Sequence, residues 1–306
     1  MKTHNILLYG AHLLLISFVL YLVQVAAFLF ISHELSCSIS KLVYLIFAAS
    51  LFLIFLDFAI FPPSRTKKFL KFNPVKNQKI SVGMTAYNDE LSIGKAVEDF
   101  INRENVNSVV VVDNNSRDRT SEQAKKAGAR VVREEIQGYG SCCMRALKEA
   151  MKYGDIICLV EGDCTFSGED LKKLEAYLEN ADMVVGTRAT KELNAPDSQM
   201  SVLLEWGNVF MAKLVQLKFW HVRLTDMGCT YRLIRKDALE KIIDKLQVKG
   251  NHFLCEMILT ALKNNLMVIE ISVTFKKRVG KSKGVGGNLF KAAETALSMW
   301  RLIISK

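Results

Sequence analysis

Two long apolar runs dominate the first sixty residues of the chain. Residues 6–31 contain no charged side chain, and residues 42–61 contain only one, Asp57. About 20 apolar residues are enough for a helix to cross the hydrocarbon core of a membrane. The pattern therefore predicts two transmembrane helices, joined by residues 32–41 into a hairpin with both ends on one side of the membrane. For the second run the alternative is a buried core helix. The first run is too long for a cleaved signal peptide.

The segment after this hairpin domain (residues 1–61) is basic and rich in proline. Residues 62–79 contain six lysine or arginine residues, no acidic residue, and three of the four prolines of the chain. Lys and Arg beside a membrane span stay on the cytoplasmic side, and they are attracted to an anionic lipid surface. The sequence therefore predicts a juxtamembrane linker at 62–79, followed by a cytoplasmic domain at 80–306.

From residue 80 onward, short apolar runs alternate with amphipathic stretches. Strands are expected at 80–84, 108–112, 130–132, 155–160 and 183–185, and helices at 92–102, 120–127, 139–153 and 171–180. This alternation predicts an α/β domain with a mostly parallel sheet and helices on both faces. Ligands of such sheets bind beyond the carboxyl ends of the strands. No GxGxxG or GxxxxGK[ST] motif follows the first strand, which argues against a dinucleotide dehydrogenase and a P-loop NTPase.

Composition narrows the function classes. The net charge is +10 at pH 7, and because the four charges of residues 1–60 cancel, the whole excess lies in residues 61–306. A basic domain favours anionic partners such as membrane phosphates or nucleotides. Nucleic acid is disfavoured, because the basic residues are not interleaved with a platform of stacking aromatics. Seven scattered cysteines without a CxxC motif argue against a disulfide scaffold and a structural zinc protein.

The most informative polar cluster follows the buried strand expected at 155–160. Glu161 and Asp163 are separated only by Gly162. Two carboxylates at a strand end form a hard-oxygen site for Mg²⁺ or Mn²⁺, which could bridge a diphosphate; the alternative is a solvated turn. Asp113, after the second strand, could accept a hydrogen bond from a base or a ribose.

At these positions the chain resembles the family 2 glycosyltransferases, whose GT-A fold binds nucleotide sugars. Residues 84–90 are similar to the family's P-A-Y-N-E-E opening, 112–120 to V-D-D-G-S-x-D-x-T, 159–163 to L-D-A-D, and 185–188 to I-G-S-R. Residues 225–232 resemble the later D-x-x-C/S-G-F-R. Residues 275–283 resemble the R-x-x-G-x-S-K segment of polyprenyl-phosphate sugar synthases such as the dolichyl-phosphate mannose synthases.

The resemblance implies an inverting enzyme that moves a sugar from a UDP- or GDP-sugar to a polyprenyl or dolichyl phosphate, with Mg²⁺ or Mn²⁺ as cofactor. It implies metal ligation by Glu161 and Asp163, and catalytic roles for Asp163, Asp226 and Arg232. For the nucleotide sugar it implies Ala86, Tyr87, Asn88, Glu90, Asp113, Asn115, Ser116, Gly138, Gly162 and Arg188. For the acceptor phosphate it implies Arg278, Ser282 and Lys283, which lie in a basic loop at 275–287.

Several positions depart from the family pattern. Asn114 and Asn115 stand where the family usually has Asp-Gly, so the second nucleotide-facing acid is an amide here. Glu161 replaces the first Asp of the metal triplet, and Thr165 stands where the dolichyl-phosphate mannose synthases tend to have Gln. The base and the sugar are therefore left open, whereas the expected fold and metal site are unaffected.

Residues 202–220 mix aromatic and aliphatic residues with Glu205, Lys213 and Lys218. This pattern suits an amphipathic helix at the membrane interface, and a buried core helix is the alternative. A prokaryotic cell membrane is favoured over an endoplasmic reticulum membrane, and the oligomeric state is left open.

Two other functions fit parts of the sequence. One is transfer to a hydroxyl of a lipid or polysaccharide, which requires a general base, with Asp226 as the candidate. The other is a non-catalytic membrane scaffold built on the same domain.

Overall fold

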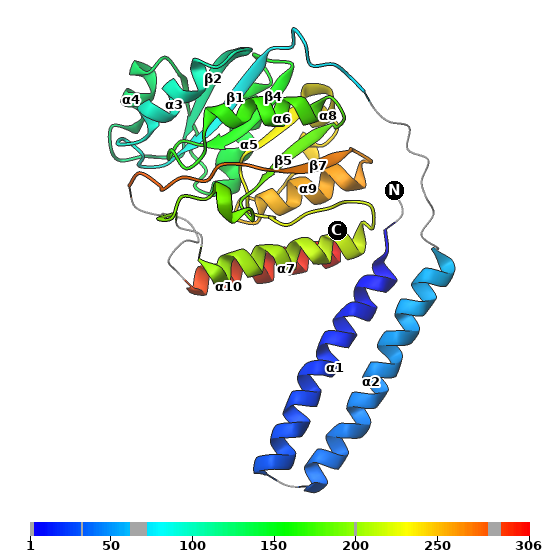
Figure 1. Ribbon diagram of the computed structural model, residues 1–306. Coiled ribbons are helices and arrows are strands. Elements are labelled where there is room, and N and C mark those ends of the chain that lie inside the picture. Colours follow the sequence, from blue (N-terminus) through cyan, green and yellow to red (C-terminus); the bar gives the residue numbers. More distant parts are fainter. Residues whose placement is uncertain (1–2, 32, 62–71, 199–200, 281–288) are drawn as a thin grey trace. The chain divides into compact units, whose positions relative to one another are not determined.

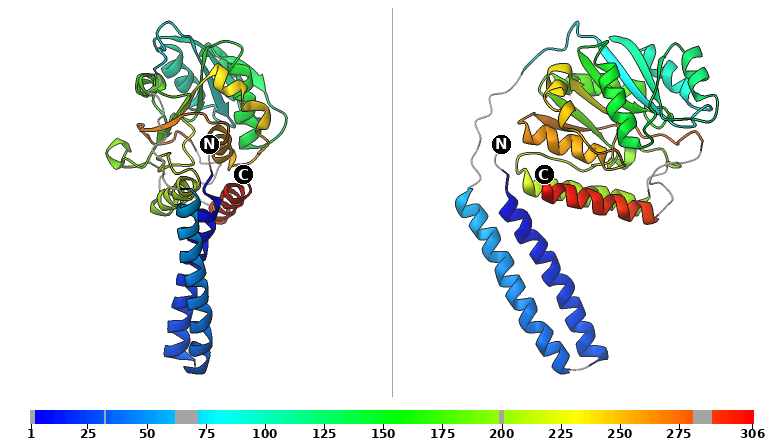
Figure 2. Two further views of the ribbon diagram at one scale, coloured as in Figure 1. Left: turned by 90° about the vertical axis from the view of Figure 1, so that its right-hand side faces the viewer. Right: turned by 180° about the vertical axis from the view of Figure 1, so that it is seen from behind.

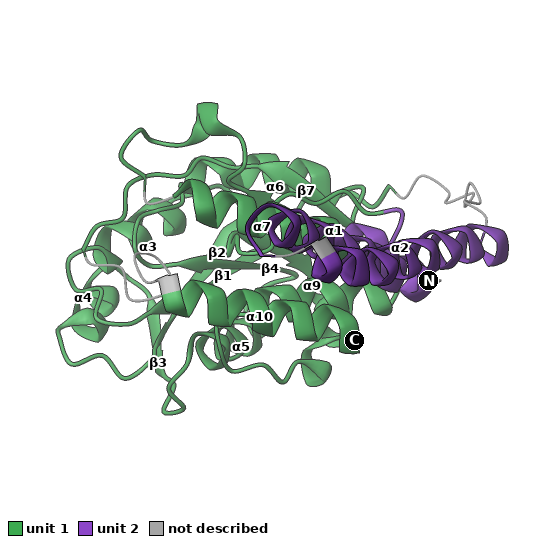
Figure 3. Ribbon diagram, turned by 90° about the horizontal axis from the view of Figure 1, so that it is seen from below, with its two compact units in different colours: residues 1, 69–215, 222–306 green, residues 2–68, 216–221 purple. Residues whose placement is uncertain are grey.

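Residues 3–31, 33–61, 72–198, 201–280 and 289–306 are described by the computed structural model. The chain divides into two units, coloured separately in Figure 3. The smaller unit contains residues 2–68 and 216–221, and the larger unit contains residues 69–215 and 222–306.

The smaller unit is built on a helical hairpin of α1 (Asn5–Phe30) and α2 (His33–Ile60), shown in Figure 1. Both helices are candidate membrane spans by length and composition. The helix α2 begins at His33, so most of the expected connection at 32–41 is helical. That segment has no Gly or Pro, and Glu34 lies in the first turn, where the helix dipole favours an acidic side chain.

The single acidic residue of the second apolar run, Asp57, is fully buried. Its Oδ2 lies 2.6 Å from Nδ1 of His4, and its Oδ1 accepts a hydrogen bond from the N–H of Leu7 at 3.1 Å. Asp57 therefore caps the first turn of α1 from the neighbouring helix. This pairing explains how a carboxyl group is accommodated in the apolar run of residues 42–61.

The larger unit is organised around a seven-stranded sheet in the order β3-β2-β1-β4-β6-β5-β7. Its strands are β1 (Ile80–Ala86), β2 (Val106–Asp113), β3 (Arg130–Arg133), β4 (Ile156–Glu161), β5 (Met183–Thr187), β6 (Arg232–Arg235) and β7 (Val268–Ser272). The strand β6 is antiparallel to β4 and β5, and the other pairs are parallel. The predicted α/β fold with a mostly parallel sheet is confirmed.

Helices cover both faces of this sheet, which explains why β1 and β4 are almost continuously apolar. On one face the core is closed by α3 (Ile93–Ile101), α4 (Thr120–Lys126) and α6 (Leu171–Leu178). Against the other face lie α5 (Tyr139–Ala150) and α9 (Phe253–Lys263), and α8 (Lys236–Glu240) follows β6. Short 3₁₀ helices lie at Gly168–Asp170, Lys191–Leu193 and Ile243–Lys245.

Two longer helices, α7 (Val202–Lys218) and α10 (Leu289–Ser305), run alongside each other with a space between them (Figure 2 and Figure 3). The left view of Figure 2 looks nearly along both and shows them as separate rods. Seen from below in Figure 3, the ends of β1 and β4 are visible between them. These helices can therefore form two walls around the strand ends.

The sequence pattern located β1 to β5 and α3 to α6 but gave no signal for β6, β7, α9 or α10. It also placed the domain boundary too late. Val75 belongs to the hydrophobic core, and the N–H of Asn73 donates to the carbonyl of Glu179. Residues 72–79 of the expected linker are thus part of the larger unit, and residues 62–71 lie outside the described part of the chain.

The contact between β1 and α5 gives a test of this packing. A Cβ added at Gly83 would lie 2.7 Å from the carbonyl oxygen of Ala146, a backbone atom of α5. Gly83→Ala should therefore lower the free energy of unfolding by about 1–3 kcal/mol, measured by denaturant unfolding of the detergent-solubilised chain. Gly94→Ala, in helix α3, is the matched control, because its nearest neighbour, the carbonyl oxygen of Gln123 in α4, would be 3.9 Å away. Equal stability of the two variants would contradict the packing.

Candidate functional site

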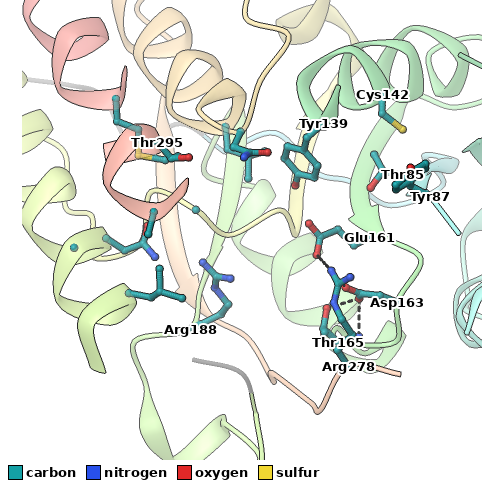
Figure 4. Close-up of a pocket in the computed structure, with 18 of the residues that line it drawn as sticks. Thr85, Tyr87, Tyr139, Cys142, Glu161, Asp163, Thr165, Arg188, Arg278 and Thr295 are labelled. Carbon is teal, nitrogen blue, oxygen red and sulfur yellow. Dashed lines mark hydrogen bonds and ion pairs between the residues drawn. The ribbon is translucent and has the colours of Figure 1, made fainter. Parts of the chain in front are cut away.

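A pocket of about 640 Å³ opens at the carboxyl ends of β1, β4 and β5 (Figure 4). Its polar lining includes Thr85, Tyr87, Asp89, Asn114, Gln137, Tyr139, Glu161, Asp163, Thr165, Arg188, Asn208 and Arg278. Its apolar lining includes Leu203, Leu204 and Met211 of α7, Leu254, Phe275, and Ala292, Ala293, Ala296 and Met299 of α10. One cavity thus joins a charged floor to apolar helical walls.

The acidic pair predicted from the sequence lies on the floor of this pocket. Glu161 is the last residue of β4, and Asp163 follows in the turn. The Oδ1 of Asp163 accepts hydrogen bonds from the N–H and the hydroxyl of Thr165, at 3.0 and 2.6 Å. Gly162 allows this turn, because a Cβ there would lie 2.4 Å from Cδ1 of Ile93. The remaining oxygen of Asp163 is therefore directed away from the turn.

Two residues that the sequence analysis missed hold Glu161. The hydroxyl of Thr230 donates to Oε1 of Glu161 at 3.1 Å, and the hydroxyl of Tyr139 lies 2.5 Å from that of Thr230. Tyr139 begins α5, and Thr230 lies in the loop before β6. Neither position could be linked to Glu161 from the sequence, because the contact depends on how α5 and this loop meet.

Arg188 reaches the pocket from the residue after β5 and is held by a buried carboxylate. Its Nε and Nη2 donate to Asp226 at 2.7 and 2.9 Å. Burial opposes ionisation of Asp226, but Arg188 and backbone N–H groups outweigh it and hold the pKa of Asp226 below its usual range. Glu270 of β7 accepts hydrogen bonds from the N–H groups of Thr225 and Asp226, which fixes this loop. Asp226 is thus a charged partner of Arg188.

Arg278 brings a second positive charge to the floor. Its Nη2 lies against Oδ2 of Asp163 and 3.7 Å from Oε2 of Glu161, as Figure 4 shows. Burial raises the pKa of Glu161 to about 7, and repulsion from Asp163 adds to this effect, while Arg278 opposes it. Ser282 and Lys283, the other residues expected at an acceptor phosphate, lie outside the described residues.

Four of the residues expected to bind a nucleotide connect two strand ends in the structure. Ser116 accepts a hydrogen bond from the N–H of Asn88 at 2.8 Å, and Asp113 accepts one from the N–H of Ser116 at 2.8 Å. Glu90 accepts one from the N–H of Arg119 at 3.1 Å. These side chains brace the turns after β1 and β2 and do not line the pocket, whereas Ala86 and Tyr87 do.

Asn115 and Gly138 shape the backbone beside the pocket. Asn115 has a positive φ of 63°, and its Nδ2 donates to the carbonyl of Glu135 at 2.8 Å. Gly138 lies so close to Lys249 that a Cβ would be 2.5 Å from its carbonyl oxygen. Both residues therefore shape the loops beside the pocket, and their contact with a nucleotide stays a prediction. Gly162, described above, has the same kind of role.

Arg232, for which a catalytic role is expected, is not among the residues that line the pocket. Its side chain is fully buried, and its guanidinium donates to the carbonyls of Leu254 and Cys229 at 3.0 and 2.6 Å. In the pleat of β6, its neighbours Tyr231 and Leu233 point into the core on the opposite face. Arg232 therefore points toward α9 and does not line the pocket.

The donor set on the floor fits a divalent cation that arrives with a diphosphate. Glu161 and Asp163 offer oxygen ligands that face one common positive group, Arg278. Within the described ranges, no third His, Cys, Asp or Glu joins them to form a set of three. The remaining ligands of Mg²⁺ or Mn²⁺ would then be phosphate oxygens and water, which suits sites that bind metal together with a substrate phosphate.

Residues 81–243 match the model of the family described as Glycosyl transferase family 2. The chain is 29% identical over 208 residues to the low-salt glycan biosynthesis hexosyltransferase Agl6 of Haloferax volcanii, covering 66% of this chain and about half, 49%, of that protein. It is 28% identical to a dolichyl-phosphate hexose transferase of the same organism, covering 67% and 86%. It is 27% identical to an undecaprenyl-phosphate mannosyltransferase of Micrococcus luteus, covering 58% and 76%.

Solved structures show the same fold at lower identity. Glucosyl-3-phosphoglycerate synthase from Mycobacterium tuberculosis, in complex with Mn²⁺, UDP-glucose and phosphoglyceric acid, superposes with a TM-score of 0.59. The match has 16% identity and covers 76% of this chain and 81% of that one. It shows a shared α/β architecture in the larger unit.

The raised pKa of Glu161 predicts a pH dependence of cation binding. A proton on Glu161 competes with the metal, so Mn²⁺ affinity should rise by up to about tenfold per pH unit below about pH 7 and level off above it. Paramagnetic resonance of free Mn²⁺ measures this affinity. The charged groups acting on Glu161 are Asp163, Arg278 and Arg188, and Tyr139 lies beside it. Glu161→Gln should flatten the profile, and a flat wild-type profile would contradict the assignment.

Proposed function

Because the chain belongs to the family 2 glycosyltransferases, we propose that it transfers a hexose from a nucleotide sugar to a polyprenyl phosphate. The observation that carries this proposal is the pocket itself, in which carboxylates and arginines meet apolar walls from α7 and α10. A nucleotide sugar needs the polar part, and an isoprenoid chain needs the apolar part. The named activities of the relatives from Haloferax volcanii and Micrococcus luteus support the same substrate classes.

On the donor side, Glu161 and Asp163 would hold Mg²⁺ or Mn²⁺ against the diphosphate. The metal would neutralise the negative charge that develops on the leaving nucleoside diphosphate. Arg188 keeps its charge beside Asp226 and is directed into the pocket by this bidentate pair. Its guanidinium can contact phosphate without losing its orientation. Both UDP and GDP fit this proposal, because Asp113 and Asn115 are not among the residues that line the pocket.

On the acceptor side, a phosphate monoester brings its own nucleophile. Its second pKa is near 6, so an oxygen is already anionic at neutral pH. This oxygen would form a bond to the anomeric carbon while the bond from that carbon to the donor diphosphate breaks. The nucleoside diphosphate leaves with the bonding electron pair, and in-line attack inverts the configuration. Arg278 is the candidate partner of the acceptor phosphate, because guanidinium groups bind phosphate bidentately.

The two alternative functions fit the pocket less well. Transfer to a hydroxyl requires a free general base, but Asp226 is buried and accepts two hydrogen bonds from Arg188. A non-catalytic scaffold would not need Glu161, Asp163 and Arg278 to converge in one cavity. The phosphate-acceptor function uses each of these features.

We further propose that the protein is an integral membrane protein of a prokaryotic cell, with the larger unit in the cytoplasm. The two apolar helices support membrane insertion, and the basic residues of 62–79 support this orientation. The relatives described above are archaeal and bacterial proteins. The exposed side chains Val202, Trp206 and Phe210 of α7 and Phe290 and Leu297 of α10 support contact of these helices with lipid.

The proposed reaction is tested by incubating the purified chain with Mn²⁺, a panel of radiolabelled UDP- and GDP-sugars, and undecaprenyl phosphate. We expect label from one donor in the lipid phase, and Asp163→Asn should reduce the rate about a hundredfold or more, because it weakens the metal site. Asp155→Asn, at the opposite end of β4, is the matched control and should be active. Transfer to undecaprenol instead of its phosphate would support the hydroxyl alternative, and no transfer from any donor would support the scaffold.

The acceptor role of Arg278 has a separate kinetic signature. A charge-assisted hydrogen bond contributes roughly 1.5–3 kcal/mol, so Arg278→Ala should raise the apparent KM for polyprenyl phosphate by about one to two decades. Arg278→Lys should recover only part of this loss, because it keeps the charge without the bidentate geometry. An increase in the KM of the nucleotide sugar alone would overturn the acceptor assignment.

The orientation in the membrane is tested by thiol labelling of sealed cells. A cysteine introduced at Ser64 should react with an impermeant maleimide only after the membrane is opened. The native, exposed Cys37 lies near the turn of the hairpin and serves as the control for the other side. Labelling of the Ser64→Cys variant in sealed cells, in a chain that also carries Cys37→Ser, would refute a cytoplasmic larger unit.

A further inference from the structure

Arg278 occupies the position in the pocket where a bound cation would be expected. Its Nη2 contacts Oδ2 of Asp163, which is the oxygen that Thr165 leaves available, and lies 3.7 Å from Oε2 of Glu161. The Arg278 and Asp163 side chains are 17% and 2% exposed. The ion pair is therefore largely withdrawn from water. Charges attract each other more strongly in such a site than they do in water.

The backbone around Arg278 holds it beside the acidic turn. The N–H of Lys276 donates to the carbonyl of Thr165 at 2.7 Å, and the N–H of Val279 donates to the carbonyl of Asp163 at 3.1 Å. These two hydrogen bonds flank Arg278 on either side. The backbone on both sides of Arg278 is thus hydrogen-bonded to the turn that carries Asp163.

The acidic pair cannot serve Arg278 and a metal ion at the same time. Two adjacent carboxylates in a buried site repel each other, and removing the positive charge that contacts them is costly. Arg188 is not an equivalent substitute, because both of its contacts described above are made to Asp226. A divalent cation bound with a diphosphate would replace the charge that Arg278 now supplies.

We infer that Arg278 is a placeholder for the catalytic cation. When the metal and the donor diphosphate enter, the guanidinium of Arg278 leaves the carboxylates and becomes available to the acceptor phosphate. This inference rests on the proposed function and adds an order to it. Metal and donor bind first, because only then can Arg278 leave Asp163 without leaving two buried carboxylates unpaired. The lipid phosphate binds second, at the guanidinium that has been released.

The direct test is the affinity for Mn²⁺ alone, measured by paramagnetic resonance without any nucleotide. Arg278→Ala removes the competing cation and should bind Mn²⁺ about tenfold tighter than wild type, or more, if the ion pair is worth at least about 1.4 kcal/mol. Lys277→Ala is the matched control, because it removes the same charge one residue away. Lys277 pairs with the exposed Asp197 on the surface. This variant should leave the affinity within about twofold. Unchanged or weaker Mn²⁺ binding by Arg278→Ala would overturn the inference.

A second measurement uses the wild-type chain and does not depend on any variant folding. Binding of farnesyl phosphate is measured by calorimetry, first without and then with saturating Mn²⁺ and UDP or GDP. The inference predicts binding that is about tenfold tighter, or more, once the metal and nucleotide are present. Equal affinity in both conditions would contradict it. Because neither measurement requires sugar transfer, a failure of the placeholder role is distinguishable from a failure of the proposed reaction.

Discussion

Two neighbouring carboxylates at the end of a buried strand need a positive partner, and the rest of the pocket is arranged around this need. Glu161 and Asp163 are positioned by β4, whose main-chain groups are paired with β1 and β6 in the middle of the sheet. Burial and mutual repulsion raise the pKa of Glu161 to about 7, while Arg278 opposes this shift. Two buried carboxylates favour a bound positive group. Replacing Arg278 by a metal ion should therefore cost less than removing Arg278 and leaving the carboxylates without a partner.

The other charged groups are held by residues at a distance from the pocket floor. Glu270 fixes the backbone of Thr225 and Asp226, and Asp226 in turn directs Arg188. Tyr139 and Thr230 hold Glu161 in the same way. Arg188 and Glu161 therefore enter the pocket with their orientation set before a ligand binds, which reduces the ordering cost of binding.

The sequence predicted those features whose signals are local. The strand β4 and its acidic turn could be read from adjacent residues, as could the two apolar helices. The partner of Asp226 could not, because Arg188 is 38 residues away and the pairing depends on the antiparallel insertion of β6. The direction of Arg232 depends on the same insertion, since the pleat decides which face each residue of β6 meets. The turn residues Asn88, Glu90 and Asp113 have family-like identities, and in the structure their hydrogen bonds are made to residues 116–121.

The cation is expected to bind at the carboxylate oxygens of Glu161 and Asp163 that Arg278 now contacts. A structure of the full chain with Mn²⁺ and UDP or GDP, with the metal located by its anomalous scattering, tests this expectation most directly. The expected result is Mn²⁺ bound to Oδ2 of Asp163, with the guanidinium of Arg278 withdrawn from both carboxylates. Mn²⁺ bound elsewhere, or bound while Arg278 still contacts Asp163, would contradict it.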